Sequence, residues 1–340
     1  MSSRTRVTIR DIAREAGVST ATVSRVMNNP DTVSRRTLET VNAVIARHGY
    51  LSDGIAVSLA LARTLTIGVV IPTITNSIYA ASTQAIQGAA RAAGYTVLLG
   101  VSEFSPTTED QLIRQLLKRR VDGLILTGVE RSSEIYESIG AARIPFVVTW
   151  KQADAAAGMA SVSFDNYQGA RLAMSHLVEL GHRRIGLVCG RSKLNDRARE
   201  RRRAYQDVMR EIGTDVRHDW VHEADFDHAE GRRAMQKLLA APSRPTAVFC
   251  ANDIQAIGAL FECQEQGIEV PGQISIVGFD DVPAAQYVRP QLTTIRVPAQ
   301  AMGEIAAKRL LEAIDRRGEP VGQTLPVELV VRGTTRQAQD

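Results

Sequence analysis

Absences in the chain of 340 residues already exclude several classes of protein. It has no apolar run near 18 residues and no N-terminal signal pattern, so we expect neither a membrane span nor export. It has only three cysteines, Cys189, Cys250 and Cys263, which are widely spaced and odd in number. This usage argues against a disulfide framework and favours reduced, mostly buried thiols in a cytoplasmic protein.

Sequence motifs typical of enzymes are also missing. We find no Walker-type phosphate loop, no G-x-G-x-x-G and no G-x-S-x-G, and the cysteines have no suitable partner motif. The run HDWVHEADFDH (218–228) gathers histidines and acids, but its alternation is typical of a strand and loop, and no glutamate follows its first histidine as in zinc helices. We therefore expect no enzymatic activity, no metal and no cofactor.

The first 63 residues carry the most specific pattern in the chain. Thr8 precedes Asp11 by three residues, as in a capping box, and Ser19 and Ser34 are candidate caps for a second and a third helix. Two short helices joined by a tight turn, with a third packed on them, form the unit that lays its second helix in the major groove of DNA. A helical bundle with an ordinary polar surface is the alternative interpretation.

The distribution of charge favours the DNA-reading interpretation. Residues 1–63 contain nine arginines and five acidic residues, which gives this segment a net charge of +4. The remaining 277 residues contain 32 basic and 32 acidic residues and are neutral. All of the net charge therefore lies on the segment expected to contact phosphates.

The rest of the chain alternates strands and helices. The predicted strands cover residues 65–72, 96–101, 123–127, 146–150, 184–189, 247–251 and 274–279, with a last strand at 327–331. The predicted helices cover residues 78–93, 109–119, 167–180, 199–212, 229–240 and 254–266. This alternation predicts two doubly wound α/β lobes of parallel strands, with a ligand-binding cleft between them.

Several segments, in this order, resemble the lac repressor family of bacterial transcriptional regulators (LacI/GalR type). They are VTIRDIAREAGVSTATVSRVMNNPDTVSRRT, HGYLSDGIAVSLA, LTIGVVIPTITNSIYA, VDGLIL, HLVELGHRRIGLV, PTAVFCANDIQAIGAL, ISIVGFDDVP and PQLTTI. The resemblance spans nearly the whole chain. It implies an all-α helix-turn-helix head followed by an α/β two-lobed body like a type 1 periplasmic binding protein.

The resemblance also implies a division into domains. We expect the helix-turn-helix domain at 1–52, a hinge helix at 53–63, and an effector-binding and dimerisation domain at 64–340. Within this last domain the first lobe is predicted at about 64–163 and 293–325, and the second at about 164–292 and 326–340.

By resemblance, the bases of a palindromic double-stranded operator are read from the second helix and the phosphates are contacted around it. The predicted readers are Thr20, Ala21 and Arg25, and the predicted phosphate contacts are Thr8, Ser19, Thr22, Asn28 and Ser34. Leu59 in the hinge helix is predicted to insert into the minor groove and unstack a base step, although a core leucine is the alternative. Gly54 departs from the more polar residue expected there and weakens an isolated hinge helix.

The resemblance places a small-molecule effector in the cleft. The predicted effector residues are Asn76, Tyr79, Thr127, Trp150, Phe164, Arg201, Phe226, Asn252 and Asp280. Asp280 and Asp281 are adjacent in a strand-end loop, so we expect only one of them to face the cleft. The alternative for Asp280 and Asn252 is that they merely cap helices.

The identity of the effector is left open between chemical classes. The segment 195–203 (NDRARERRR) carries five arginines, and Lys151 follows Trp150, which favours an anion unless these residues are only a solvated helix face. PTITNSIYA and DGLILT also resemble the gluconate-operon repressors, although GFDDVP is the general sugar-regulator form. A sugar acid such as gluconate is therefore our working hypothesis.

The sequence as a whole predicts a cytoplasmic, nucleoid-associated repressor that a sugar or sugar acid releases from its operator. The resemblance implies a homodimer, and we expect no tetramer because no leucine heptad follows the last strand; we also expect no membrane partner. A solute-binding protein for transport and a corepressor-dependent, purine-type regulator are the alternative functions.

Overall fold

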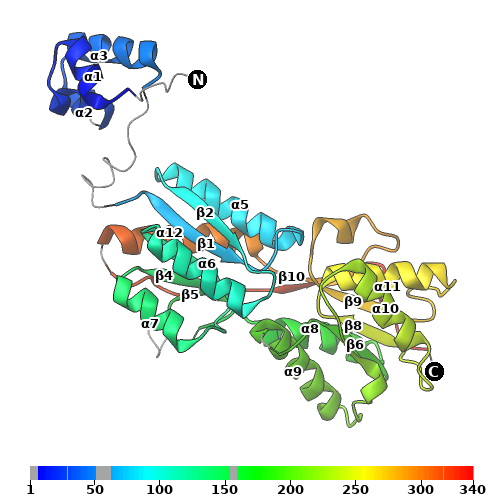
Figure 1. The fold of residues 1–340 in the computed structure, drawn as a ribbon. Helices are drawn as coiled ribbons and strands as arrows, with labels where there is room; N and C mark the ends of the chain where they lie inside the picture. Colours follow the sequence, from blue (N-terminus) through cyan, green and yellow to red (C-terminus); the bar gives the residue numbers. More distant parts are fainter. Residues whose placement is uncertain are drawn as a thin grey trace, which may run out of the picture. The chain divides into compact units, whose positions relative to one another are not determined.

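The computed structural model describes residues 7–28, 30–50, 63–153, 159–193, 195–316 and 318–339 (Figure 1). The chain divides into two compact units, residues 1–64 and residues 65–340, here called the N-terminal unit and the body. No helix in the described part of the chain is long and apolar enough to cross a membrane.

The N-terminal unit is a bundle of short helices. Its elements are α1 (Ile9–Ala16), α2 (Thr20–Asn28), the 3-10 turn η1 (Pro30–Thr32) and α3 (Arg35–His48). Ile12, Val23 and Val41 are completely buried, one from each helix, and form the centre of a small apolar core. In each helix, apolar residues recur at the spacing of one helical turn and so form an apolar face. The three helices pack together because these faces are buried against one another.

Local hydrogen bonds fix the ends of these helices. The backbone N–H and the hydroxyl of Thr8 both donate to the Asp11 carboxylate, at 3.0 and 2.6 Å. Ser19 accepts from the backbone N–H of Thr22 at 3.1 Å and so caps α2. Gly17 adopts φ of 67°, a left-handed conformation that costs glycine little, and this lets the chain turn between α1 and α2.

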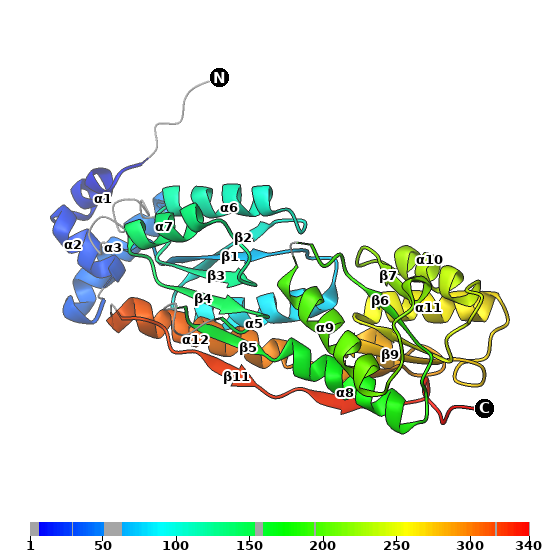
Figure 2. The ribbon, with the colours of Figure 1, turned by 90° about the horizontal axis from the view of Figure 1, so that it is seen from below.

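The body begins with a six-stranded sheet in the order β11-β5-β4-β3-β1-β2, parallel throughout. Its strands are β1 (Thr66–Ile71), β2 (Thr96–Val101), β3 (Gly123–Thr127), β4 (Phe146–Thr149), β5 (Ser161–Phe164) and β11 (Gln323–Leu325). Helices α5 (Ser77–Ala92) and α12 (Ala299–Arg316) cover one face, and α6 (Pro106–Lys118) and α7 (Ser133–Ala142) cover the other (Figure 2). Alternate residues of β3 therefore enter different cores, Ile125 on one face and Leu124 with Leu126 on the other.

The second sheet has the order β12-β10-β9-β8-β6-β7, and only the β10–β12 pair is antiparallel. Its strands are β6 (Ile185–Cys189), β7 (Val221–Glu223), β8 (Ala247–Cys250), β9 (Ser275–Asp280), β10 (Thr293–Arg296) and β12 (Glu328–Val330). Helices α8 (Asn166–Glu179) and α9 (Asp196–Glu211) pack on one face, and α10 (His228–Leu239) and α11 (Asp253–Glu265) on the other. Two short 3-10 turns, η3 (His218–Trp220) and η4 (Pro283–Gln286), complete this lobe.

The chain passes between the two lobes three times, after β5, after β10 and after β11. One predicted boundary is wrong, because the sequence assigned residues from 293 onward to the first lobe. In the structure β10 pairs with β9 and β12, so the second passage follows Arg296. The short sequence of β10, Thr-Thr-Ile-Arg, does not distinguish between the two sheets, and only its pairing decides where it belongs.

The βα alternation predicted for the body is present, and most predicted elements lie within a few residues of the observed ones. The prediction omitted α7, β5, β10, α12 and β11. The omission of α12 matters most, because this helix packs against α5 and three strands and carries the chain back to the first sheet. The three cysteines are free and buried.

Two glycines allow α10 and α11 to pack at very short distance. A Cβ atom added at Gly258 lies 2.2 Å from the carbonyl oxygen of His228, and one added at Gly231 lies 2.3 Å from the carbonyl oxygen of Gln255. Each glycine thus faces the backbone of the opposite helix, which cannot move aside as a flexible side chain would.

We expect Gly258→Ala to lower the free energy of unfolding by about 1–3 kcal/mol or more, because the added methyl group overpacks this contact. Urea denaturation followed by tryptophan fluorescence measures it, since Trp150 and Trp220 both lie in the body. Gly140→Ala in α7 is the matched control, because nothing lies within 4 Å of its added Cβ. Equal stability of the two variants would contradict this account of the packing.

Candidate functional site

A pocket lies between the two lobes, at the edge where parallel strands of both sheets end. The free space is about 430 Å³, part of which is open to solvent. The residues that line this effector pocket are Asn76, Ile78, Tyr79, Phe104, Trp150, Gly190, Asn195, Arg197, Ala198, Arg201, Phe226, Ala251, Asn252 and Asp280. Strand ends of parallel sheets are the usual position of ligand sites in doubly wound folds.

Three helices begin at the pocket, and each has an asparagine at its N-cap. The side-chain oxygen of Asn76 accepts from the N–H of Ile78 at 3.2 Å, and that of Asn252 accepts from the N–H of Ile254 at 2.8 Å. Asn195 caps α9 in the same way. Because the cap uses the amide oxygen, the NH2 group of each asparagine is left to donate, and three positive helix ends converge on one pocket.

Arg201 is the most constrained side chain of the pocket. Its Nε donates to the side-chain oxygen of Asn166 at 3.0 Å, and its Nη1 donates to the carbonyl oxygen of Ala251 at 2.6 Å. The guanidinium carbon lies 3.7 Å from the centre of the Phe279 ring. Nη1 is also 3.7 Å from a carboxylate oxygen of Asp280. Burial lowers the pKa of Arg201, with Asp280 opposing this effect.

Asp280 is the acidic residue of the pocket, and its neighbour Asp281 faces elsewhere. Asp280 accepts from the amide nitrogen of Asn252 at 3.0 Å. Burial raises the pKa of Asp280 to about 7, although the charge of Arg201 opposes this shift. Asp281 instead pairs with Arg296 at 2.7 Å and with Arg332 at 2.6 Å. Both aspartates have positive φ, 118° and 54°, and this turn sends the two side chains in different directions.

Aromatic rings form two walls of the pocket. Tyr79 and Trp150 of the first lobe have ring centres 4.6 Å apart. Phe104, which follows β2, stacks on Phe226, which follows β7, with ring centres 5.0 Å apart and planes 25° apart. The second pair joins the two lobes, and both pairs offer faces that can cover the apolar surface of a small ring.

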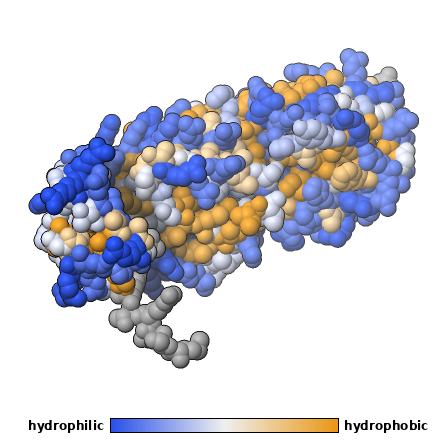
Figure 3. All heavy atoms as spheres, turned by 90° about the horizontal axis from the view of Figure 1, so that it is seen from above, coloured by the Kyte–Doolittle hydropathy of each residue, from blue (hydrophilic) through white to orange (hydrophobic). Residues whose placement is uncertain are grey.

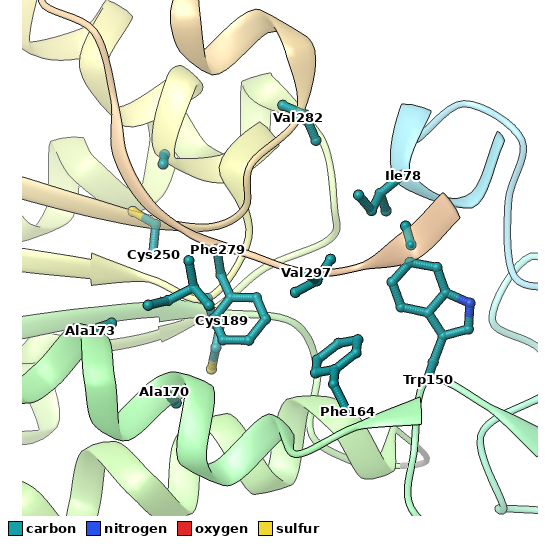
Figure 4. Close-up of a cluster of buried hydrophobic side chains, with 14 of the residues drawn as sticks. Ile78, Trp150, Phe164, Ala170, Ala173, Cys189, Cys250, Phe279, Val282 and Val297 are labelled. Carbon is teal, nitrogen blue, oxygen red and sulfur yellow. The ribbon is translucent and has the colours of Figure 1, made fainter. Parts of the chain in front are cut away.

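Seven of the nine predicted effector residues line this pocket, and two do not. The ring of Phe164 is completely buried between Trp150 and Phe279, with centres at 6.0 and 6.3 Å, and belongs to the core that joins the lobes (Figure 4). The hydroxyl of Thr127 donates to the carbonyl of Val70 at 3.1 Å and lines a neighbouring hollow.

Sequence reasoning missed Phe104, Asn195 and Arg197 as pocket residues. Phe104 follows a predicted strand, so the same strand-end rule that gave Asn252 points to it. Arg197 is buried, donates to Asp196 at 2.8 Å and is hydrogen-bonded to Tyr79. Both Asn195 and Arg197 lie in the arginine-rich segment that the sequence singled out, Asn195 as the N-cap of α9 and Arg197 one helical turn before Arg201.

The other arginines of this segment do not enter the pocket. Arg202 pairs with Glu223 at 2.5 Å, and Arg203 pairs with Glu200 at 3.6 Å. Lys151 pairs with Glu200 at 3.3 Å and does not line the pocket. Of the positive charges that suggested an anion, only Arg197 and Arg201 remain inside.

The start of α9 also binds the loop that follows β3 across the cleft. The backbone N–H of Val129 donates to the Asp196 carboxylate at 2.7 Å. Arg199 pairs with Glu130 at 2.5 Å. These contacts connect the two lobes directly beside the pocket. They therefore depend on how closely the two lobes approach each other.

In the N-terminal unit, α2 presents its predicted base readers to solvent. Thr20, Ala21 and Arg25 are exposed, whereas Val23 and Val26 of the same helix are buried. The exposed face therefore carries the small and hydrogen-bonding groups that base edges require.

The predicted phosphate contacts have structural roles as well. Thr8, Ser19 and Ser34 are exposed cap residues at the starts of α1, α2 and α3, and Thr22 is hydrogen-bonded to Ser19. Free N–H groups at such helix starts are natural phosphate ligands. The side chain of Asn28 and the whole of Leu59, with the predicted hinge up to residue 62, lie outside the described residues.

An exposed reading helix in one unit and a two-lobed pocket in the other define a ligand-responsive DNA-binding regulator. Residues 8–53 match the bacterial regulatory proteins of the lacI family, and residues 174–335 match the periplasmic binding protein-like domain. The chain is 35% identical to the HTH-type transcriptional repressor PurR of Klebsiella pneumoniae over 92% of each protein. The chain belongs to the lacI family of regulatory proteins, and it is a repressor of this family.

Solved structures agree with this assignment. The lac repressor dimer bound to operator and an anti-inducer is 30% identical, with a TM-score of 0.86 over 98% of this chain and 100% of that one. A LacI family transcriptional regulator from Enterococcus faecium with bound ribose is 27% identical, with a TM-score of 0.71 over 81% of this chain and 100% of that one.

The raised pKa of Asp280 predicts a dependence of stability on pH. The folded protein keeps this proton up to about pH 7, whereas the unfolded chain releases it near 3.8. Since the folded state then binds more protons, the free energy of unfolding falls as the pH rises through this window. We expect wild type to lose stability relative to Asp280→Asn as the pH rises from about 3.8 to about 7.

Urea denaturation of both proteins at several pH values measures this difference. Asp207→Asn is the control, because hydrogen bonds from Arg210 and Tyr167 lower the pKa of that half-buried carboxyl out of the same window. Parallel stability curves for wild type and Asp280→Asn would show that Asp280 does not titrate there.

Proposed function

We propose that the effector of this repressor is a small anion of the sugar-acid class, bound in the effector pocket. One observation carries the proposal: three helix N-termini and two buried guanidinium groups converge where the only described acidic lining residue is Asp280. Such a pocket offers many donors and one strong acceptor. It therefore favours a ligand with a negative group and several oxygen acceptors.

A sugar acid satisfies each part of the pocket. Its carboxylate accepts from Arg201 and the helix starts, and its hydroxyls donate to Asp280 and accept from the asparagine NH2 groups. The Phe104–Phe226 pair covers the C–H surface. A bound sugar in the regulator from Enterococcus faecium supports the size of such a ligand.

A purine-type regulator is the second candidate. The similarity to PurR over nearly the whole chain favours it, and so do the stacked faces of Phe104 and Phe226, which suit a planar ring. A purine presents carbonyl and ring-nitrogen acceptors to Arg201 and N–H donors to Asp280. In this case the ligand acts as a corepressor and strengthens operator binding.

For the sugar-acid case we propose induction. The ligand changes the closure of the lobes, which shifts the contacts of Asp196 and Arg199 across the cleft and weakens operator binding. The coupling is reciprocal, so operator DNA weakens effector binding by the same factor. A solute-binding protein for transport does not need a helix that reads DNA. The exposed residues of α2 therefore disfavour that alternative.

We also propose that the working form is a homodimer on a palindromic operator. Apolar side chains form patches on the face of the body shown in Figure 3. Leu99 is 41% exposed on β2, the edge strand of the first sheet, and Phe261 and Tyr287 of the second lobe are 45% and 77% exposed. A large contiguous apolar patch commonly marks a protein contact, whereas single scattered apolar side chains are normal on a surface. Analytical ultracentrifugation determines the oligomeric state directly.

We expect gluconate to raise the melting temperature of the wild-type protein and Arg201→Gln to abolish this shift, because a ligand that binds only the folded state stabilises it. Arg202→Gln is the matched control, since its side chain lies one residue further along α9 and pairs with Glu223 outside the pocket. Hypoxanthine, guanine and neutral sugars complete the thermal-shift panel. A shift with a purine and none with any sugar acid would replace the first candidate by the second.

For the operator, we expect Arg25→Ala to weaken specific DNA binding by about 1–3 kcal/mol, because an arginine in the major groove commonly reads guanine with two hydrogen bonds. Fluorescence anisotropy with operator and scrambled duplexes at one salt concentration measures the difference. An equal loss on both duplexes would make Arg25 a phosphate contact instead of a base reader.

A further inference from the structure

A second hollow in the body has no part in the function proposed above. It lies at the amino ends of strands of the second sheet, at the opposite edge from the effector pocket. Arg184 directly precedes β6, Thr246 directly precedes β8, and Gln273 lies two residues before β9. Residues of the tail, including Arg336, close the hollow, which encloses about 720 Å³, part of it open to solvent.

The charged side chains that line this hollow, here called the arginine hollow, are all positive. Arg184, Arg244 and Arg336 line it, and none of the described residues that line it is acidic. The carboxylate of Glu269 lies close to Gly272 at the rim but is not among the lining residues. Within the described chain no ion pair involves any of the three arginines, whereas most arginines of α9 are paired.

Arg244 carries the strongest sign of a missing partner. Its Nε and Nη2 atoms have no acceptor within the described structure, and both are closed off from solvent, so a ligand in the hollow meets them only when the side chain turns outward. A buried donor without an acceptor is unfavourable, and more so when the group is charged. Native structures leave few such groups, so two on one guanidinium call for an explanation.

Hydrogen bonds already hold the floor of the hollow in place. His182 is buried, and both of its ring nitrogens have hydrogen-bond partners. Nδ1 lies 2.9 Å from the Thr246 hydroxyl, and Nε2 lies 3.1 Å from the carbonyl oxygen of Arg336. The contacts of Arg184 and Arg336 themselves are weak, each a single Nε donation at 3.4 Å to a nearby backbone carbonyl. The backbone is thus fixed, and most of the guanidinium N–H groups remain to donate.

We propose that the arginine hollow binds the phosphoryl group of a small molecule or inorganic phosphate. A phosphoryl group presents three terminal oxygens and up to two negative charges, so it can accept from several guanidinium groups at once. A carboxylate is largely satisfied by one bidentate arginine, which leaves the other two without a partner. Unlike the effector pocket, this hollow has no aromatic wall among its described residues, so it recognises the charged group and not a ring.

The test measures orthophosphate binding to the full-length protein by titration calorimetry at constant ionic strength. We expect saturable binding that becomes at least about tenfold weaker in Arg244→Gln and in Arg336→Gln, since each loses charged hydrogen bonds to the phosphate. Arg336 lies in the tail, so its variant keeps the test decisive if Arg244→Gln does not fold. Arg210→Gln, an exposed arginine on α9, is the control for loss of one positive charge.

Two further variants separate this hollow from the other arginine-rich sites. Binding that persists in Arg201→Gln and Arg25→Ala supports the proposal, because those variants damage the effector pocket and the DNA-reading helix. Loss in either of them with retention in Arg244→Gln and Arg336→Gln would overturn it, as would the absence of saturable binding to wild type. Ribose 5-phosphate, titrated into Arg201→Gln, distinguishes the source: tighter binding than orthophosphate indicates an organic phosphate, and equal binding indicates the inorganic ion.

Discussion

A guanidinium group removed from water must be satisfied on all sides, and the body is arranged around one such group. Arg201 is held by Asn166 at the start of α8, by the carbonyl of Ala251 at the end of β8, and by the ring of Phe279 on β9. Asn166 in turn donates to the carbonyl of Trp150 in the first lobe, at 2.7 Å. One charge thus links a helix start and two strand ends of the second lobe to the first lobe. Loss of any partner leaves a buried charge less compensated.

The pair Asp280 and Asp281 connects the ligand site to the segments that join the lobes. Asp280 faces the pocket, beside Arg201 and Asn252. Asp281 binds Arg296, at the end of β10, and Arg332, just after β12. Both of these strands adjoin passages between the lobes. Asp280 is thus joined, through one peptide bond and a left-handed turn, to residues beside the passages between the lobes.

The sequence predicted most strongly those features that depend on local pattern. Caps such as Thr8 and Ser34 and the strand-end position of Asn252 follow from short-range rules, and the structure shows each of them. The sequence was less informative about features that depend on strand pairing and on the packing of the core. The sheet that receives β10 is decided by its neighbours, and the direction of Phe164 is decided by the core that it fills between Trp150 and Phe279. The five arginines of 195–203 look alike in sequence, yet only the helical face that turns inward places Arg197 and Arg201 in the pocket.

The direction of the allosteric response depends on which contacts change with closure, and not on how tightly the effector binds. A ligand shifts an equilibrium between two arrangements only by the difference in its affinity for them. Val129 with Asp196, Glu130 with Arg199 and Phe104 with Phe226 are all made across the cleft, and any rotation of one lobe against the other breaks them. A bulky ligand that separates Phe104 from Phe226 opposes the present closure, whereas a flat ligand that Arg201 and Asp280 draw inward reinforces it. Both kinds of ligand proposed above meet the same residues, so they differ in which of these contacts across the cleft they favour.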